Sequence, residues 1–187
     1  MGSEIDLNSN AQNGTERANE TENHFESQGR LRNMTGIYLT CGDKILLLYR
    51  QGSRVVNNLW VASAGGHLEA SELNDAKACV LRELKEELGL TEDTLTDLRL
   101  RYATLRRMKG EIRVNYYFFA ELKGGTEMPL KSDEGTLRWF PMEELEGLEM
   151  PFTAGFVLKH YLEIGRRTAA LYGGVADGER VLFVEME

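Results

Sequence analysis

The sequence has few cysteines, no long apolar run and no excess of basic residues. Its two cysteines, Cys41 and Cys79, lack CxxC spacing and have no histidine partner nearby in the sequence, which argues against a zinc site or a disulfide framework and favours a reducing compartment. No run of 18 apolar residues occurs, and the N-terminus lacks a charged segment followed by an apolar one. Neither a membrane span nor export is therefore predicted, and a cytoplasmic location is expected.

The charge balance is acidic, with 22 Lys and Arg against 30 Asp and Glu, a net charge of −8 and a pI near 5.1. A protein that binds nucleic acid nonspecifically normally carries a basic surface, so a nucleic-acid polymer is not an expected partner. An acidic enzyme can still bind a phosphate ester through a metal ion. The length of 187 residues and the hydrophobic content of 42% fit one globular domain.

The first 33 residues differ in composition from the rest. They are rich in Asn, Glu, Ser, Gln and Gly and contain few large apolar side chains. Such a segment buries too little surface to offset the entropy cost of ordering. We therefore predict a disordered extension over residues 1–33 and a single domain over residues 34–187.

A run of acidic residues between Arg82 and Leu90 predicts a helix with one acidic face. At about 100° per residue, Glu83, Glu86 and Glu87 fall within an arc of roughly 100° on one side of a helix, with leucines on another side. Three carboxylates at this spacing repel one another unless a cation lies between them. Mg²⁺ and Mn²⁺ take oxygen ligands of this kind, so this face suits a divalent cation, although three glutamates alone are more often a solvated acidic face of a surface helix.

These residues resemble the signature of the Nudix hydrolases, which has Gly, five residues, Glu, seven residues and then Arg-Glu-apolar-x-Glu-Glu-x-Gly-apolar. Gly66 and Glu72 match the first part, and the run from Arg82 to Leu90 matches the second part without a break. Nine residues separate Glu72 from Arg82 where the usual pattern has seven. The loop or first helical turn is therefore expected to be two residues longer, and the role of Glu72 is left open.

The resemblance implies an α+β fold, the Nudix α/β/α sandwich with a central mixed β-sheet and the Nudix loop-helix-loop. It also implies a magnesium site, with manganese as an alternative, and residues for each role. Glu83 is expected to orient or deprotonate water, with Arg82 as the other catalytic candidate. Substrate binding is expected at Arg50 and Arg54 and at Phe152, which begins a helix that often walls the nucleobase pocket in the family. The implied metal ligands are Gly66, Glu83, Glu86, Glu87 and Glu134.

Hydrophobic alternation and turn residues predict the remaining elements. His67, in the glycine turn, is interpreted as a structural hydrogen-bonding residue with a metal or base role as the alternative. Phe152 and the apolar residues after it are also read as core. Strands are expected over residues 35–40, 44–49, 59–61, 95–106, 111–122, 137–140 and 181–184, and helices over 142–148 and 151–161.

The expected reaction is the metal-dependent hydrolysis of a nucleoside diphosphate-linked small molecule. The compact domain, the Ser132–Gly135 loop and the strand with Trp139 and Phe140 resemble the MutT-like nucleoside triphosphate pyrophosphatases, including those that act on 8-oxo-dGTP. ADP-ribose or another nucleoside diphosphate derivative is the main alternative substrate, and isoprenoid diphosphate isomerisation is a more distant one. A catalytically silent domain that senses nucleotides is the alternative of another class. A homodimer is the expected assembly.

Overall fold

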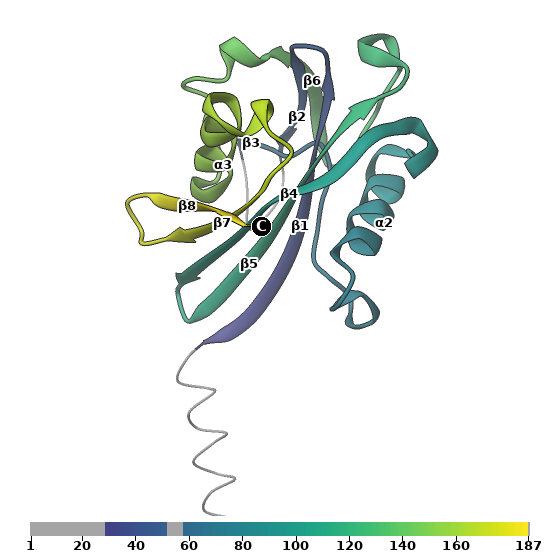
Figure 1. Ribbon diagram of the computed structural model, residues 1–187. Coiled ribbons are helices and arrows are strands. Elements are labelled where there is room, and N and C mark those ends of the chain that lie inside the picture. The colour runs from purple at the N-terminus through teal and green to yellow at the C-terminus, as the bar shows by residue number, and fades with distance from the viewer. Residues whose placement is uncertain (1–28, 52–57, 187) are drawn as a thin grey trace, which may run out of the picture.

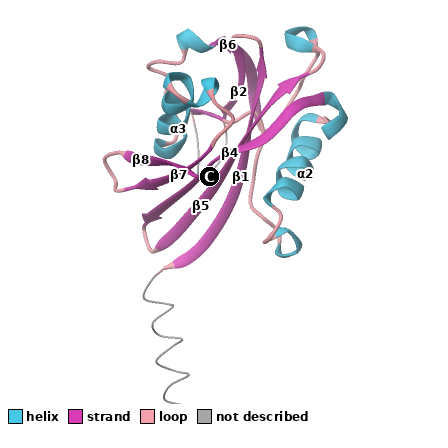
Figure 2. Cartoon of the chain, viewed as in Figure 1, coloured by secondary structure: helices cyan, strands magenta, loops and turns pink. Residues whose placement is uncertain are grey.

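A single mixed β-sheet lies between two α-helices in the computed structural model, which describes residues 29–51 and 58–186 (Figures 1 and 2). Within these residues, no helix has the length and apolar character needed to cross a membrane. The elements are β1 (Arg30–Cys41), β2 (Lys44–Arg50), β3 (Leu59–Val61), η1 (Ala70–Glu72), α2 (Ala76–Leu88), η2 (Glu92–Thr94), β4 (Leu95–Met108), β5 (Glu111–Leu122), η3 (Gly125–Glu127), β6 (Gly135–Pro141), η4 (Met142–Glu144), α3 (Phe152–Glu163), η5 (Gly165–Arg167), β7 (Leu171–Ala176) and β8 (Val181–Met186).

The strand order is β3-β2-β1-β5-β4-β7-β8, and β6 pairs with β2. The long strands β1 and β5 run parallel at the centre, where Arg30 to Thr40 align with Glu111 to Glu121. Strand β4 is antiparallel to β5, and the β7–β8 hairpin continues the sheet from β4. This order places the beginnings of β1 and β5 and the end of β7 beside the end of β4.

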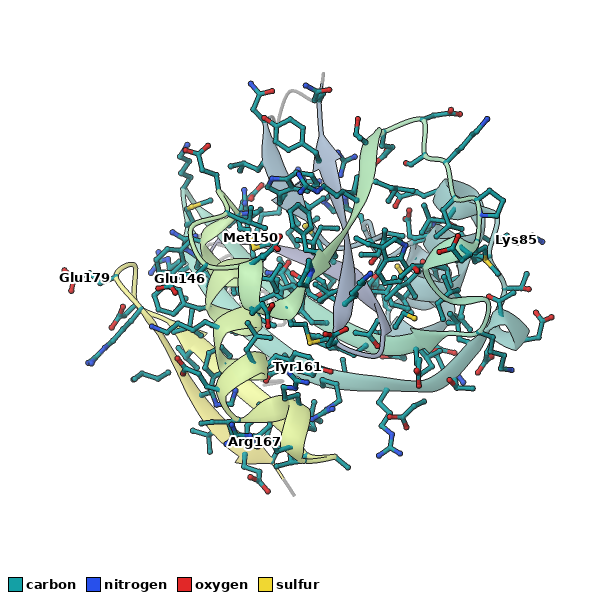
Figure 3. The ribbon with its side chains drawn as sticks, turned by 90° about the horizontal axis from the view of Figure 1, so that it is seen from above. Lys85, Glu146, Met150, Tyr161, Arg167 and Glu179 are labelled. Atoms are coloured by element: carbon teal, nitrogen blue, oxygen red, sulfur yellow. The ribbon has the colours of Figure 1, made fainter. Side chains whose placement is uncertain are left out.

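The two faces of the sheet carry separate parts of the core. Side chains alternate between the faces of a strand, so Ile37 and Leu39 of β1 pack with Leu84 of α2, whereas Tyr38 packs with Val157 of α3. Seen from above in Figure 3, the labelled Lys85 of α2 and Tyr161 of α3 lie on opposite sides of the sheet. The predicted α+β sandwich with a mixed sheet is therefore confirmed.

Most predicted elements are present, with three corrections. The predicted bounds of β3 and β5 match the structure, and the hairpin turn at 41–43 joins β1 to β2. Strand β1 begins at Arg30, so residues 30–33 belong to the sheet and not to the expected disordered extension, whose residues 1–28 lie outside the described residues. The helix expected over 142–148 is only the short turn η4. The sequence reading missed β7, in which Gly173 and Gly174 interrupt the apolar pattern.

Candidate active site

Helix α2 begins and ends where its capping residues place it. The side chain of Asp75 accepts a hydrogen bond from the Ala78 N–H at 2.9 Å, and this satisfies one of the free donors in the first turn. Gly89 ends the helix in the left-handed conformation that glycine favours, with φ of 68°, and its N–H donates to the Lys85 carbonyl. The longer spacing between Glu72 and Arg82 covers the three residues after η1 and the first turns of α2.

Arg82 links three carboxylates of this segment. Its Nε and Nη2 donate to the two oxygens of Glu72 at 2.8 and 3.0 Å, and its Nη1 donates to Glu83 at 2.8 Å and to Glu86 at 3.0 Å. Nη2 also donates to the His67 carbonyl. The hydrogen bonds from Arg82 lower the pKa of Glu72 to about 2. Glu72 therefore contacts Arg82 despite the longer spacing. Its buried carboxylate also accepts the Glu69 N–H and so fixes the loop before α2.

The two glycines before η1 allow carboxylates of α2 to approach the backbone. The Gly65 N–H donates to Glu87 Oε2 at 3.0 Å. A Cβ on Gly65 would lie 2.3 Å from the Thr35 carbonyl oxygen, and a Cβ on Gly66 would lie 2.3 Å from Glu83 Oε1. Gly65 requires glycine because its close neighbours are backbone atoms, whereas a side chain at Gly66 would displace the Glu83 carboxylate.

Glu87 and Glu134 form a pair of acidic side chains in a partly buried recess. Burial, followed by the charge of Glu134, raises the pKa of Glu87 to about 8. Arg50 Nη2 lies 2.7 Å from Glu134 Oε2 as an ion pair, but this buried oxygen has no hydrogen bond of suitable geometry. Arg50 therefore neutralises part of the charge and leaves the oxygen able to accept another partner.

A pocket begins at this acidic pair and continues along the sheet towards α3. Its lining includes Glu87 and Glu134 at one end and Tyr117, Asn115 and Phe152 at the other. A second hollow adjoins it, shares Arg50, Gly65, Glu87 and Glu134, and reaches Gly66, Arg82 and Glu83. The expected residues Arg50 and Phe152 thus lie on one continuous depression, although they are about 100 residues apart in the chain.

The structure does not bring all the expected ligands together. The side chain of Glu86 is 58% exposed and contacts Arg82, away from the Glu87–Glu134 pair. The Gly66 carbonyl accepts a hydrogen bond from the Thr35 N–H at 2.8 Å. Arg54 lies outside the described residues. Within 29–51 and 58–186, no three His, Cys, Asp or Glu side chains converge as a preformed metal cluster.

The residues of the recess nevertheless fit a divalent cation. Glu134 Oε2 meets the charge of Arg50 but has no hydrogen bond of suitable geometry, and the pKa of Glu87 is raised, so the protein alone compensates the negative charge of the pair only in part. Oxygen donors of this kind suit Mg²⁺ and Mn²⁺. Glu87 and Glu134, with Glu83 beside Gly66, are the side chains positioned to hold such an ion.

His67 and the far end of the pocket add features beyond the expected ligands. His67 Nε2 accepts a hydrogen bond from Arg32 Nε at 2.5 Å, which agrees with a structural role. Asn115 and Tyr117 line the pocket but were assigned only to a buried strand by the sequence reading. Alternation along β5 places them on one face, yet the sequence does not tell which face meets the pocket.

Comparisons with known proteins agree with this arrangement. The family model for the NUDIX domain matches residues 30–160. The mutator MutT protein of Bacillus halodurans is 26% identical, with a TM-score of 0.58, over 82% of this chain and 97% of its own. A search of curated protein sequences gives no match.

Two further solved structures share the fold. The MutT Nudix hydrolase of Burkholderia pseudomallei is 20% identical, with a TM-score of 0.56, over 70% of this chain and 97% of its own. The Ap4A hydrolase of C. elegans is 19% identical, with a TM-score of 0.57, over 73% of this chain and 99% of its own. Since the family model covers well over half of the residues and carries the helix with its glutamates, the chain belongs to the Nudix family as a MutT-like Nudix hydrolase.

Proposed function

We propose that this Nudix hydrolase converts a nucleoside triphosphate to a nucleoside monophosphate and pyrophosphate, with an oxidised purine nucleotide such as 8-oxo-dGTP as the first candidate. Nudix hydrolases act on nucleoside diphosphate derivatives and generally use divalent metal ions. The observation that carries the proposal is the continuous pocket from the Glu87–Glu134 pair to the aromatic wall at Phe152. One end suits phosphates and a cation, and the other suits one nucleobase.

We assign the carboxylates different roles, metal binding or water activation, according to their contacts. A divalent cation, Mg²⁺ with Mn²⁺ as the alternative, would neutralise phosphate oxygens and lower the pKa of a bound water. Glu87 and Glu134 would hold it, with Gly66 and Glu86 as further candidates. We assign Glu83 as the residue that orients or deprotonates the attacking water, because Arg82 donates to its carboxylate, which lies beside Gly66.

Two arginines support this site in different ways. Arg82 donates to Glu72, Glu83, Glu86 and the His67 carbonyl, so we assign it as a positioning residue that keeps the catalytic carboxylates in place. Arg50 pairs with Glu134, both side chains line the pocket, and Arg50 is assigned to a substrate phosphate. Water attacks one phosphorus, the bridging P–O bond breaks, and the proton of the water passes to Glu83.

The nucleobase is assigned to the end of the pocket at Phe152. Phe152 offers an aromatic face for stacking, and Asn115 offers both a donor and an acceptor to the edge of a base. ADP-ribose pyrophosphatase activity is the competing assignment, because that substrate also has one base beside a diphosphate.

Product analysis tests the proposal. The purified protein is incubated with 8-oxo-dGTP, dGTP, the other nucleoside triphosphates, ADP-ribose and dinucleoside polyphosphates, each with Mg²⁺ or Mn²⁺. We expect pyrophosphate and nucleoside monophosphate in equal amounts from a triphosphate. Turnover of ADP-ribose alone would replace the substrate, and nucleotide binding without turnover of any compound would favour the sensor alternative.

We also propose a homodimer, supported by an apolar patch on the α2 face of the sheet, beyond the helix. Eight large apolar side chains are exposed among the described residues, and six of them lie on strands of this face. Strand register places Leu105, Val175 and Leu182 side by side. The six are Leu31, Leu105, Val175, Leu182, Val184 and Met186.

Two identical apolar patches can meet without a charge penalty, whereas monomers rarely expose such a surface. The assay is analytical ultracentrifugation of the wild type and of Val184→Lys. We expect a dimer for the wild type and a shift towards monomer for the variant. A wild type that is monomeric at all concentrations would contradict the assembly.

A further inference from the structure

The end of the pocket at Phe152 is lined by side chains that donate hydrogen bonds. Arg106, Arg113 and Asn115 line it beside Phe152, whereas the two carboxylates of the pocket lie at its other end. An arginine has five N–H donors and no acceptor, and an asparagine amide has two donors and one carbonyl oxygen. The part of the pocket assigned to the nucleobase therefore has more donors than acceptors.

Three arginines lie in register across this end of the sheet, and two of them have other partners. Arg32 of β1 pairs with Arg113 of β5, and Arg113 pairs with Arg106 of β4. The guanidinium of Arg106 lies over the Phe152 ring, 4.3 Å from its centroid. Arg32 donates to His67 Nε2 and lines the adjoining hollow, not this pocket. Arg113 is thus the arginine of the pocket that is left for a ligand.

Glu111 holds Arg113 by one edge of its guanidinium. Arg113 Nε donates to Glu111 Oε2 at 2.8 Å, and Arg113 Nη2 lies 2.8 Å from the same oxygen. The hydrogen bond from Arg113 lowers the pKa of Glu111, so the carboxylate stays charged and compensates the arginine. Within 29–51 and 58–186, Nη1 of Arg113 has neither a hydrogen bond nor an ion pair with the protein. A guanidinium that is fixed in orientation and already paired with a carboxylate suits a neutral acceptor, such as a carbonyl oxygen, better than a second anion.

Asn115 extends the same donor surface along the strand. It follows Arg113 by two residues on β5, so the two side chains face the same side of the sheet, a step of about 7 Å apart. Both line the pocket beside the aromatic ring of Phe152. One flat base in this part of the pocket therefore meets both side chains.

The two side chains differ in the bases that they accept. Guanine, 8-oxoguanine and hypoxanthine carry a carbonyl oxygen at purine position six, which is an acceptor, whereas adenine carries an amino group there, which is a donor. An amide has both a donor and an acceptor and can serve either base. Arg113 has only donors, so an adenine amino group facing it would leave both groups without an acceptor.

We propose that Arg113 is a specificity-determining residue, whose Nη1 donates to the carbonyl oxygen of a 6-oxopurine, so that guanine-type nucleotides are preferred to adenine nucleotides. Glu111 fixes the guanidinium, and Asn115 contacts neighbouring atoms of the same base. This inference rests on the proposed function, because it concerns the base of the same substrate.

The test compares dGTP, dITP and dATP with Mg²⁺ in the wild type, Arg113→Gln and Arg113→Lys. The base of dITP keeps the carbonyl oxygen but lacks the exocyclic amine of guanine. In the wild type we expect kcat/KM to be about 10- to 100-fold higher for dGTP and dITP than for dATP. Arg113→Gln should reduce this preference about 10-fold, because glutamine also accepts a hydrogen bond from the adenine amino group. Arg113→Lys, which still only donates, should retain part of the preference.

Arg99→Gln is the matched control because it removes the same charge elsewhere on the sheet. Arg99 is on β4, is 49% exposed and pairs with Asp97, and it lines neither the pocket nor the adjoining hollow. Its ratio of kcat/KM for dGTP to that for dATP should stay within about twofold of wild type. An equal loss of kcat/KM for dGTP and dATP in Arg113→Gln would show that Arg113 contributes only charge, and this would overturn the inference.

A second measurement separates base recognition from hydrolysis. Calorimetric binding of GMP and AMP in the presence of EDTA compares the two bases without turnover. We expect GMP to bind the wild type about 10-fold more tightly than AMP and the two to bind Arg113→Gln about equally. Thermal unfolding checks that the variant is folded, which we expect because Glu111 keeps Arg32 as a partner at 3.5 Å.

The outcomes are distinguishable from failure of the proposed function. If no triphosphate is hydrolysed but GMP is preferred to AMP and this preference depends on Arg113, the proposed reaction is wrong and the base assignment remains. If triphosphates are hydrolysed with no preference between dGTP and dATP in the wild type, or with the same preference in Arg113→Gln, the inference is overturned and the proposed reaction remains.

Discussion

Replacing Arg82 by methionine should destabilise the protein, because it leaves two nearly buried carboxylates without their partner. The side chains of Glu72 and Glu83 are only 10% and 14% exposed, and Arg82 makes two hydrogen bonds to the first and one to the second. Removing one partner of a buried ion pair costs about 3–5 kcal/mol. Against a typical unfolding free energy of about 5–15 kcal/mol, this loss is large.

The loss can be measured by urea unfolding followed by circular dichroism, with a double-mutant cycle to isolate the pair. Glu72→Gln alone should cost about 1–3 kcal/mol, and the double variant should cost less than the two single effects added together. Lys85→Met serves as the control, because Lys85 lies on an exposed side of the same helix. A change below about 1 kcal/mol in Arg82→Met would refute the role of Arg82 as the link between the Glu72 and Glu83 carboxylates.

The same contact predicts a dependence of stability on pH. The pKa of Glu72 is about 2 in the folded protein, below its ordinary value of 4.5, because Arg82 favours the charged form. Its contribution to stability is therefore complete above pH 4.5 and is lost as the pH falls towards 2. Arg82→Met should flatten the unfolding free energy over this interval. An identical slope in wild type and variant would contradict the assignment.

Three other substitutions test separate parts of the site. Gly65→Ala places a Cβ 2.3 Å from the Thr35 carbonyl oxygen, so we expect a loss of about 1–3 kcal/mol in urea unfolding; unchanged stability would contradict the close approach. Glu134→Gln removes a negative charge beside Glu87, so NMR titration without metal should show the pKa of Glu87 below about 8. An unchanged pKa of Glu87 would refute the electrostatic coupling between the two glutamates. Phe152→Ala should raise KM for a nucleotide about 5- to 30-fold, and an unchanged KM would place the base elsewhere.

The helix and its acids could be predicted from the sequence because their evidence is local. Gly89 sets the end of α2, and the spacing of Glu83 and Glu87 sets their face of the helix. The central strands are similarly evident from their apolar alternation. Strand β7 was missed because its two glycines weaken the pattern, and its pairing with β4 depends on contacts about 70 residues apart.

Which side chains share the pocket could not be read from the sequence. Arg32 and Arg113 are 81 residues apart, and only the register of β1 with β5 brings them together. Taken singly, each arginine on a strand is most simply a solvated side chain. In the same way, the contact of Glu134 with Arg50 depends on a β6 strand that pairs with β2.

The most direct test of the account is the release of pyrophosphate from 8-oxo-dGTP and dGTP with Mg²⁺, compared between the wild type and Glu87→Gln. Glu87 lies at the shared end of both hollows, and its carboxylate accepts the Gly65 N–H. We expect pyrophosphate and monophosphate in equal amounts from the wild type and at least a 100-fold lower rate from the variant, as for the loss of a group that stabilises the transition state. Equal rates in the two proteins, or no pyrophosphate from any triphosphate, would contradict the proposed reaction at this site.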